Sequence, residues 1–303
     1  MTPIVNAMSV DVEDYFQVSA FDRLVSRSDW QWFESRVVRN THRLLEFFEQ
    51  HGVRATFFML GWVAERFPDL VREIAALGHE VASHGFHHEL IYRLSQEQFR
   101  EDVRRAKAVA EDAAGCAVVG YRAPSFSVVK STLWALDVLI EEGYQYDASI
   151  FPIHHDRYGI PDAPRHIHRI ARESGEIVEV PGSTVRFGTA NLPIAGGGYF
   201  RLLPYACTRW GINRVNTVEQ KPVVFYLHPW EVDPAQPRLR VGGTTRLRHY
   251  TGLGKTLARM ERLVNDFRFD SIQSLLRREA VVAGKALNRS EGVPAGEWAH
   301  ATK

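Results

Sequence analysis

The 303-residue sequence predicts an α/β fold built around a parallel sheet, closed as a barrel or open and doubly wound. Within residues 4–149, five apolar segments alternate with segments of helical periodicity, a β-then-α order that implies parallel strands. An apolar content of 45% is enough for a substantial core. Acids, histidines and an arginine follow the predicted strands, where active sites gather in both of these architectures.

The first unit is a buried strand followed by a helix. Residues 4–10 form an apolar run that leads into three acids within four residues, Asp11, Glu13 and Asp14. Residues 35–51 then carry apolar side chains at helical spacing and stop before a glycine, which is a C-cap signal.

The second and third units bring two histidines to the end of a strand. Residues 55–60 form an apolar run, and a helix is predicted over residues 69–77. A short strand over residues 80–83 then delivers His84 and His88 into a turn. The glycine and phenylalanine between them favour a loop over a zinc-binding helix, so the pair needs a third ligand from another segment. Taken alone, two neighbouring histidines are also compatible with ordinary hydrogen-bonded side chains.

Two further units complete the N-terminal half. Ser95, with a glutamine three residues later, is a capping-box pattern that predicts a helix as far as residue 115. A strand over residues 118–121 leads into Arg122, which lies in a loop. A helix over residues 132–142 and a strand over residues 144–149 follow.

The C-terminal half is less regular. Its predicted elements are a hairpin over residues 167–180, a helix over 204–215, a strand over 223–227 that ends at His228, and helices over 250–263 and 271–278. We expect one domain over residues 1–283, with elaborations at about 152–222 and 231–283, and a flexible tail over residues 284–303.

Composition limits the classes of partner. Lys+Arg number 37 and Asp+Glu 36, so no global field favours nucleic acid or a membrane surface, and we expect a small or uncharged partner. Cys116 and Cys207 show neither a disulfide nor a zinc spacing and are expected to fill the core. Neither a signal peptide nor a membrane-spanning run is evident. We therefore expect a cytoplasmic location, or membrane association through a biosynthetic complex, and no pattern specifies an oligomeric state.

Convergence of these strand ends would create hydrolytic chemistry. Two neutral imidazoles and one carboxylate form a three-ligand metal site with open positions, which can bind water and polarise a carbonyl. A second carboxylate beside the metal could take a proton from that water if a guanidinium oriented it, and a separate histidine could protonate a leaving amine. Arg122 and His228 fit the last two roles.

These motifs, in this order, resemble those of the polysaccharide deacetylase family, the carbohydrate esterase group with a NodB-like domain. The resemblance rests on the acids of residues 11–14, the His-x-x-x-His of residues 84–88, the Arg-x-Pro of residues 122–124 and the Leu-His of residues 227–228. It covers roughly residues 4–149 and the strand that ends at His228. It implies a distorted (β/α) barrel with an irregular α+β elaboration in the C-terminal half.

The resemblance also implies an activity and a role for each catalytic residue. The activity is metal-dependent hydrolysis of N-acetyl groups on amino sugars of a polysaccharide or its precursor. Asp11 would be the base, Arg122 would steady Asp11, His228 would be the acid, and Asp147 would hold and tune His228.

The metal ligands depart from the family pattern at one position. Relatives carry two adjacent aspartates, whereas Glu13 and Asp14 follow Asp11 at two and three residues. Side chains two apart on a strand share a face, which favours Glu13 as the ligand, and Asp14 takes its place if the strand has already ended. That carboxylate, together with His84 and His88, would hold a divalent ion. Zn²⁺ is the first expectation, and Co²⁺ and Mn²⁺ are alternatives.

The expected substrate is an N-acetylated oligosaccharide or polysaccharide. Residues 196–201 and 228–231 resemble the branch of the family associated with bacterial exopolysaccharide gene clusters. Phe151 or Trp230 is expected to form an apolar wall against the acetyl group. Two other functions stay open, namely a metal-dependent amidohydrolase of a small cyclic amide and an inactive carbohydrate-binding protein.

Overall fold

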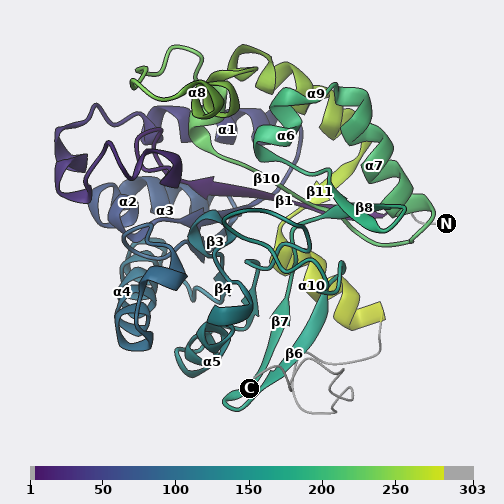
Figure 1. Cartoon of the computed structure of the whole chain (residues 1–303), viewed down its shortest axis with the longest axis horizontal. Helices are drawn as coiled ribbons and strands as arrows, with labels where there is room; N and C mark the ends of the chain where they lie inside the picture. Colours follow the sequence, from purple (N-terminus) through teal and green to yellow (C-terminus); the bar gives the residue numbers. More distant parts are fainter. Residues whose placement is uncertain (1–3, 283–303) are drawn as a thin grey trace.

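The computed structural model describes residues 4–282 and contains a nine-stranded, mainly parallel sheet (Figure 1). Its strands are β1 (Val5–Val12), β2 (Thr56–Met59), β3 (Glu80–Ser83), β4 (Gly120–Tyr121), β5 (Tyr146–Asp147), β6 (His168–Arg172), β7 (Gly175–Glu179), β10 (Val224–Leu227) and β11 (Arg268–Asp270). The strand order is β10-β1-β2-β3-β4-β5-β7-β6, and β11 pairs with the start of β1. Only β6 and β7 pair antiparallel within this sheet, so most carboxyl ends meet at one edge.

Helices cover the outside of the sheet, except for α10 (Ile272–Val282), which closes the interior of the barrel at one end. The others are α1 (Val37–Gln50), α2 (Gly61–Arg66), α3 (Pro68–Ala76), α4 (Gln96–Ala114), α5 (Trp134–Glu141), α6 (Gly197–Leu202), α7 (Tyr205–Thr217), α8 (Gly243–Tyr250) and α9 (Thr256–Asp266). In Figure 1, α1 and α6 to α9 lie above β1 and β10, whereas α3 to α5 lie below. A separate hairpin, β8 (Thr184–Phe187) and β9 (Ala190–Pro193), lies beside α7.

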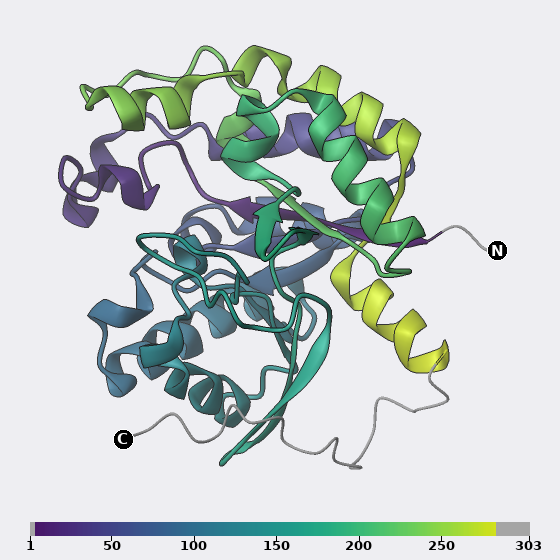
Figure 2. The ribbon, with the colours of Figure 1, turned by 45° about the vertical axis from the view of Figure 1, so that its right-hand side comes forward.

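Side chains alternate between the helix-facing core and the interior of the sheet. On β1, Met8 and Val10 belong to the large core beneath the helices, whereas Ala7 joins a smaller interior cluster. That cluster contains Phe58, Tyr146 and other strand residues, and α10 contributes Ile272 to it. Figure 2 shows α10 as the yellow helix at the lower right, beside the end of the sheet. The strands thus curve around an inner core that α10 fills from one end.

The ring closes through irregular chain rather than through a strand pair. In the part of the chain that the structure describes, β7 and β10 do not pair with each other. Instead, Ser183 Oγ accepts a hydrogen bond from the Val224 amide (2.8 Å), and Gly196 forms an isolated bridge with Tyr226. The architecture is the distorted (β/α) barrel that the sequence predicts, with its elaboration in the C-terminal half.

Most predicted elements are confirmed, including the capping box of Ser95 and Gln98 at the start of α4. The helix predicted over residues 250–263 is interrupted, because Gly252 adopts φ +80° between α8 and α9. Cys116 and Cys207 are exposed, not core residues as expected. No helix among residues 4–282 is long and apolar enough to span a membrane. The tail expected over residues 284–303 lies outside the described residues.

Gly120 should be sensitive to the smallest substitution. A Cβ at this position would overlap the ring of Tyr146, which is buried in the interior cluster and cannot swing into solvent. We expect Gly120→Ala to lower the free energy of unfolding by about 1–3 kcal/mol, as overpacking does. Urea denaturation measures this loss. Gly243→Ala is a matched control, since its Cβ would meet no atom within 4 Å, and equal losses in the two variants would contradict the explanation.

Candidate active site

The alternation of side chains brings four of the sequence-predicted residues to one mouth of the barrel. Asp11 lies two residues after Ser9 and four after the interior residue Ala7 on β1. His84 follows β3, and Arg122 follows β4, each two residues beyond an inward position. His228 directly follows β10. All four therefore point inward at the carboxyl ends of parallel strands.

Asp11 is held by a buried guanidinium. Nη1 of Arg122 lies 2.6 Å from Oδ1 of Asp11, and both side chains are almost fully buried. The same nitrogen donates to Ser9 Oγ (2.8 Å), and Nε donates to the Ala148 carbonyl (3.2 Å). The Arg122 guanidinium also lies 4.1 Å from the centre of the Phe58 ring. These contacts leave Arg122 a single orientation, so Oδ2 of Asp11 faces the mouth.

Glu13, His84 and His88 form a cluster whose ligand atoms lie within 4.8 Å of one another. Nδ1 of His84 contacts the Arg122 carbonyl oxygen (2.8 Å), which makes it the protonated nitrogen and leaves Nε2 as a free ligand atom. Burial lowers the pKa of His84 to about 4, so the ring is neutral at pH 7. Burial alone would raise the pKa of Glu13, but the contact with His88 and the charge of His228 together outweigh it and lower this pKa to about 2.

The donor set of this cluster fits a divalent cation. Oε2 of Glu13 approaches Nε2 of His88 to 2.6 Å, yet it makes no regular hydrogen bond within residues 4–282. His88 adopts φ +53°, an uncommon conformation for a residue with a side chain, which turns its ring toward Glu13. One carboxylate oxygen and two imidazole nitrogens converging on a buried point are the ligands of a catalytic metal site with open positions.

His228 lies opposite Arg122 across the mouth. Its Nε2 is 3.8 Å from Oδ2 of Asp11 and 3.7 Å from Oε1 of Glu13. Its Nδ1 lies 2.7 Å from Oε1 of Glu231, which also accepts from the His228 amide (3.0 Å). Burial alone would lower the pKa of His228, but the hydrogen bond to Glu231 and the charge of Glu13 raise it to about 9. The imidazole is therefore protonated at neutral pH and can act as an acid.

Comparison with known families agrees with this geometry. Residues 26–146 match the family model described as polysaccharide deacetylase, and residues 148–277 match a domain of unknown function (DUF3473). The chain carries a polysaccharide deacetylase domain. Asp11 and Glu13 precede the first matched segment and His228 lies in the second, so the mouth of the deacetylase barrel draws on three parts of the chain.

Curated relatives of the deacetylase domain come from several bacteria. A peptidoglycan-N-acetylglucosamine deacetylase of Bacillus cereus is 32% identical over 98 residues, which cover 32% of this chain and 36% of that protein. A peptidoglycan deacetylase of Helicobacter pylori is 32% identical over 116 residues, which cover 38% of this chain and 37% of that protein. The chain thus spans little more than a third of the length of these two relatives.

A solved structure shares the fold of this chain. A Mycobacterium smegmatis protein, provisionally assigned as a polysaccharide deacetylase, aligns with a TM-score of 0.58 and 20% identity. The alignment covers 97% of this chain and 99% of that protein. The likeness therefore extends over the C-terminal elaboration as well as the barrel.

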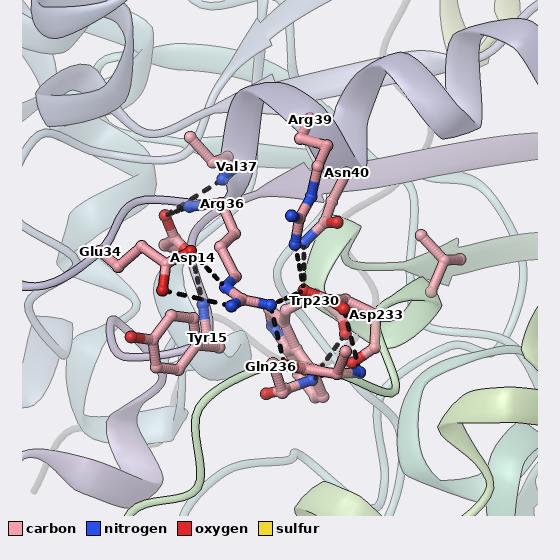
Figure 3. Close-up of polar contacts among 12 residues, drawn as sticks. Asp14, Tyr15, Glu34, Arg36, Val37, Arg39, Asn40, Trp230, Asp233 and Gln236 are labelled. Atoms are coloured by element: carbon pink, nitrogen blue, oxygen red, sulfur yellow. Dashed lines mark hydrogen bonds and ion pairs between the residues drawn. The ribbon is translucent and has the colours of Figure 1, made fainter.

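Asp14 does not belong to the cluster of Glu13, His84 and His88. Oδ2 of Asp14 accepts hydrogen bonds from the hydroxyl of Ser35 (2.7 Å) and the amides of Arg36 (2.7 Å) and Val37 (3.1 Å). Figure 3 shows the Asp14 carboxylate facing the first turn of α1. It satisfies the free amides there, as acidic N-terminal caps do. Of the two acids that the sequence leaves as ligand candidates, Glu13 is the one in the cluster.

Asp147 does not hold His228, contrary to the sequence-based expectation. Its neighbours Tyr146 and Ala148 face the barrel interior, so Asp147 points to the other face. There it pairs in register with Glu179 of β7 and accepts a hydrogen bond from Ser149. Burial raises the pKa of Asp147 to about 6. The residue that holds His228 is Glu231.

Sequence reasoning missed three residues that support His228. Glu231 lies three residues after the histidine, and Nε of Arg201 donates to its Oε2 at 2.5 Å. Trp230 stacks on the His228 ring (centroids 5.1 Å apart) and donates to Oε1 of Glu13 (3.2 Å). Trp230 thus contacts both His228, the candidate acid, and Glu13, the candidate metal ligand. Phe151 packs with Phe126 near the mouth. The three-residue spacing of His228 and Glu231 is the one local signal for this contact.

The turn after His228 is fastened to α1 through Asp233. Its Oδ2 accepts from Arg36 (3.1 Å), Arg39 (3.1 Å) and Asn40 (3.4 Å), as Figure 3 shows. Burial alone would raise the pKa of Asp233, but the hydrogen bonds from Arg36 and Asn40 outweigh it and lower this pKa. The buried carboxylate therefore stabilises the fold in its ionised form.

Asp233→Asn should therefore lower stability in a pH-dependent way. We expect a loss of about 1.5–3 kcal/mol in the free energy of unfolding at pH 7, since the lost hydrogen bonds involve charged groups. A carboxylate with a lowered folded pKa stabilises the fold above its unfolded pKa of about 3.9, and this contribution disappears as pH falls through the folded value. Urea melts at pH 7 and pH 3 test this. A difference from wild type that is as large at pH 3 would contradict the ionic role.

Proposed function

We propose that the protein is a metal-dependent hydrolase that removes N-acetyl groups from amino sugars of a polysaccharide or its precursor, within exopolysaccharide biosynthesis. One observation carries the proposal. A carboxylate, Asp11, and a protonated imidazole, His228, face each other beside the cluster of Glu13, His84 and His88. Hydrolysis of an amide requires a proton acceptor for water and a proton donor for the amine, and this arrangement offers both.

The residues of the chain divide the reaction between them. Asp11, oriented by Arg122, takes a proton from the attacking water as its oxygen bonds to the amide carbon. His228 gives its Nε2 proton to the amide nitrogen as the carbon–nitrogen bond breaks, which releases acetate and the free amine of the sugar. Glu231 keeps the ring of His228 aligned and supports its positive charge. Each proton moves to or from an atom at the mouth of the barrel.

Glu13, His84 and His88 would hold the divalent cation, and Zn²⁺ suits one carboxylate and two imidazoles, with Co²⁺ or Mn²⁺ as alternatives. When bound, such an ion would polarise the amide carbonyl and make water more acidic. Two of these residues are also oriented by further hydrogen bonds, since His84 donates to the Arg122 carbonyl oxygen and Trp230 donates to Glu13.

Acetate release from N-acetylglucosamine oligosaccharides, with and without a chelator, tests the proposal. We expect the chelator to lower the rate by at least about 100-fold, since a metal supplies several kcal/mol to such a reaction. Added Zn²⁺ should restore the rate, and metal analysis should find about one equivalent of metal in wild type and much less in His84→Ala. Unchanged acetate release in the metal-free protein would refute the metal role. Turnover of cyclic amides alone, or glycan binding without any acetate release, would support one of the two rival functions.

A further inference from the structure

The near-neutral charge of the chain conceals a strongly basic segment. Residues 234–260 contain no aspartate or glutamate. At the average of the whole chain, with 36 acids and 37 Lys and Arg in 303 residues, these 27 positions would carry about three of each. They carry six cations instead, namely Arg238, Arg240, Arg246, Arg248, Lys255 and Arg259.

Four of these cations lie on one exposed stretch, residues 234–250, which we call the basic arm. They form no ion pair with any carboxylate of residues 4–282. The backbone of the arm is nevertheless fixed, because Tyr250 Oη accepts a hydrogen bond from the Leu239 amide (2.8 Å). The exposed cations are Arg238, Arg240, Arg246 and Arg248.

Aromatic stacking anchors the basic arm to the catalytic histidine. His249, at the end of α8, stacks on Trp230 with ring centroids 4.2 Å apart, and Trp230 stacks on His228. Nε2 of His249 also lies 2.8 Å from Oε1 of Gln236, which joins the two ends of the arm. Figure 1 shows α8 above the carboxyl end of β1, the edge of the sheet that carries the site.

The buried guanidinium of Arg201 contacts both the end of the basic arm and Glu231, which holds His228. Arg201 donates to the carbonyl oxygens of Arg248 (2.9 Å), His249 (2.9 Å) and Thr251 (2.7 Å) at the end of α8. The same side chain pairs with Glu231, the partner of His228. The position of α8 is therefore tied to the reacting end of the barrel.

Aromatic residues line the mouth on the side of Tyr226. His155 and Tyr158 stack there with ring centroids 3.9 Å apart. Tyr158 in turn packs on Phe151, and Phe126 of the same group contacts Tyr226 beside His228. The end of α8, where Arg248 precedes His249, therefore lies on the His228 side of this mouth.

We propose that the substrate is an anionic glycan, an inference that rests on the proposed function. Carboxylate or phosphate groups on the units next to the N-acetylated sugar bind the basic arm. Arginine offers forked donors that match both groups, and several unpaired guanidinium groups at the entrance would concentrate an anionic chain there.

A glycan fits the arm better than an anionic membrane does. Membrane-surface helices pair their cations with a broad apolar face. On the basic arm, Leu247 (58% exposed) is the one large hydrophobic side chain that faces solvent, while Leu239 and Val241 pack against the core. The arm therefore offers charge without an apolar face for insertion.

Acetate release from oligosaccharides of equal length tests the inference. A neutral N-acetylglucosamine oligomer is compared with a hyaluronan oligomer, in which glucuronate alternates with N-acetylglucosamine, and with a neutral oligomer that carries a reducing-end diphosphate. At about 20 mM salt we expect kcat/KM to favour at least one anionic substrate roughly tenfold, and at about 500 mM salt we expect the ratio to approach one, because exposed charges are screened. The favoured substrate shows whether the anionic group lies within the oligosaccharide or at its reducing end.

Matched triple variants assign the effect to the arm. We expect Arg240→Gln with Arg246→Gln and Arg248→Gln to abolish most of the preference. Arg54→Gln with Lys221→Gln and Arg268→Gln removes the same charge from exposed residues near the amino ends of β2, β10 and β11, at the opposite edge of the sheet, and should keep it. Equal kcat/KM values for all substrates at low salt, or a preference that the arm variant retains, would overturn the inference. Binding to phosphatidylglycerol vesicles without any glycan preference would also overturn it and identify a membrane.

Direct binding separates this inference from the proposed function. Fluorescence anisotropy measures the affinity of labelled oligomers without requiring turnover. If no oligomer releases acetate but the anionic oligomers bind in a manner that depends on salt and on the arm, the deacetylase proposal fails and the anionic ligand stands. If acetate is released at equal rates and all oligomers bind alike, the deacetylase proposal stands and the anionic ligand fails.

Discussion

Asp11→Asn should reduce acetate release by about 10²–10⁴-fold while the protein stays folded and keeps its metal, because general-base catalysis contributes about this much. The substitution preserves shape, and the amide oxygen can still accept from Nη1 of Arg122, which lies 2.6 Å from Oδ1 in the native protein. It removes only the capacity to take a proton. Asp11 also lies outside the cluster of Glu13, His84 and His88, so metal content should not change. A coupled acetate assay, metal analysis and thermal melting measure the three quantities.

Asp14→Asn is the matched control, since it changes a buried carboxylate in the same short segment. Its carboxylate binds the first turn of α1 and does not face the mouth. We expect this variant to lose stability and to keep its metal and most of its turnover. Full turnover in Asp11→Asn would refute the base assignment, and loss of metal in Asp14→Asn would refute the choice of Glu13 as the ligand.

The sequence predicts which strand ends meet but not which acid binds the metal. Parallel strands and the order of motifs were enough to place Asp11, His84, Arg122 and His228 together, because alternating side chains at carboxyl ends share a mouth. The choice between Glu13 and Asp14 depends on where the strand stops. β1 runs through Val12, two residues beyond the apolar run, and the first turn of α1 then takes up Asp14. The partner that decides the matter lies more than 20 residues away in the chain.

The error at Asp147 has a related physical cause. Its short strand has only two residues, Tyr146 and Asp147, and a shift of one residue moves a side chain to the opposite face. The hydrophobic pattern could not show which face of the sheet Asp147 occupies, because apolar and aromatic residues around it are buried on both faces of the barrel wall. A local contact three residues away, His228 with Glu231, takes the role instead.

Whole-chain charge was equally uninformative about the entrance to the site. The net charge of +1 combines a segment with six cations and no acid with a remainder that carries 31 Lys and Arg against 36 Asp and Glu. The exposed arginines of the basic arm gain a functional meaning only from the fold, in which His249 of the arm stacks on Trp230 beside His228. The sequence led us to expect a small or uncharged partner. An uncharged partner would leave KM independent of salt, whereas the anionic glycan that we propose would make KM rise with salt.

Glu231→Gln should lower kcat about 10–100-fold with little change in KM, as substitutions behind a functional histidine commonly do. Oε1 of Glu231 contacts Nδ1 of His228 at 2.7 Å and supports the imidazolium that donates the proton. Burial alone would raise the pKa of Glu231, but the charges and hydrogen bonds of Arg201 and His228 together lower it, so the native group is ionised. Glutamine keeps the size of the side chain and removes the charge. Steady-state kinetics and thermal melting record both effects.

A second substitution, at Arg201, distinguishes an effect of Glu231 on stability from its effect on the proton donor His228. Glu231→Gln alone leaves the Arg201 guanidinium buried without its carboxylate, which costs about 3–5 kcal/mol for such a pair. Adding Arg201→Gln removes that charge but also the three Arg201 hydrogen bonds to the end of α8, so the double variant should regain part of the lost stability but not kcat. Asp147→Asn, which neutralises a buried carboxylate without contact to His228, should keep kcat within a small factor of wild type. If the double variant recovers both stability and kcat, Glu231 serves only to hold the fold. A large loss of kcat in Asp147→Asn would instead return the role of supporting His228 to Asp147.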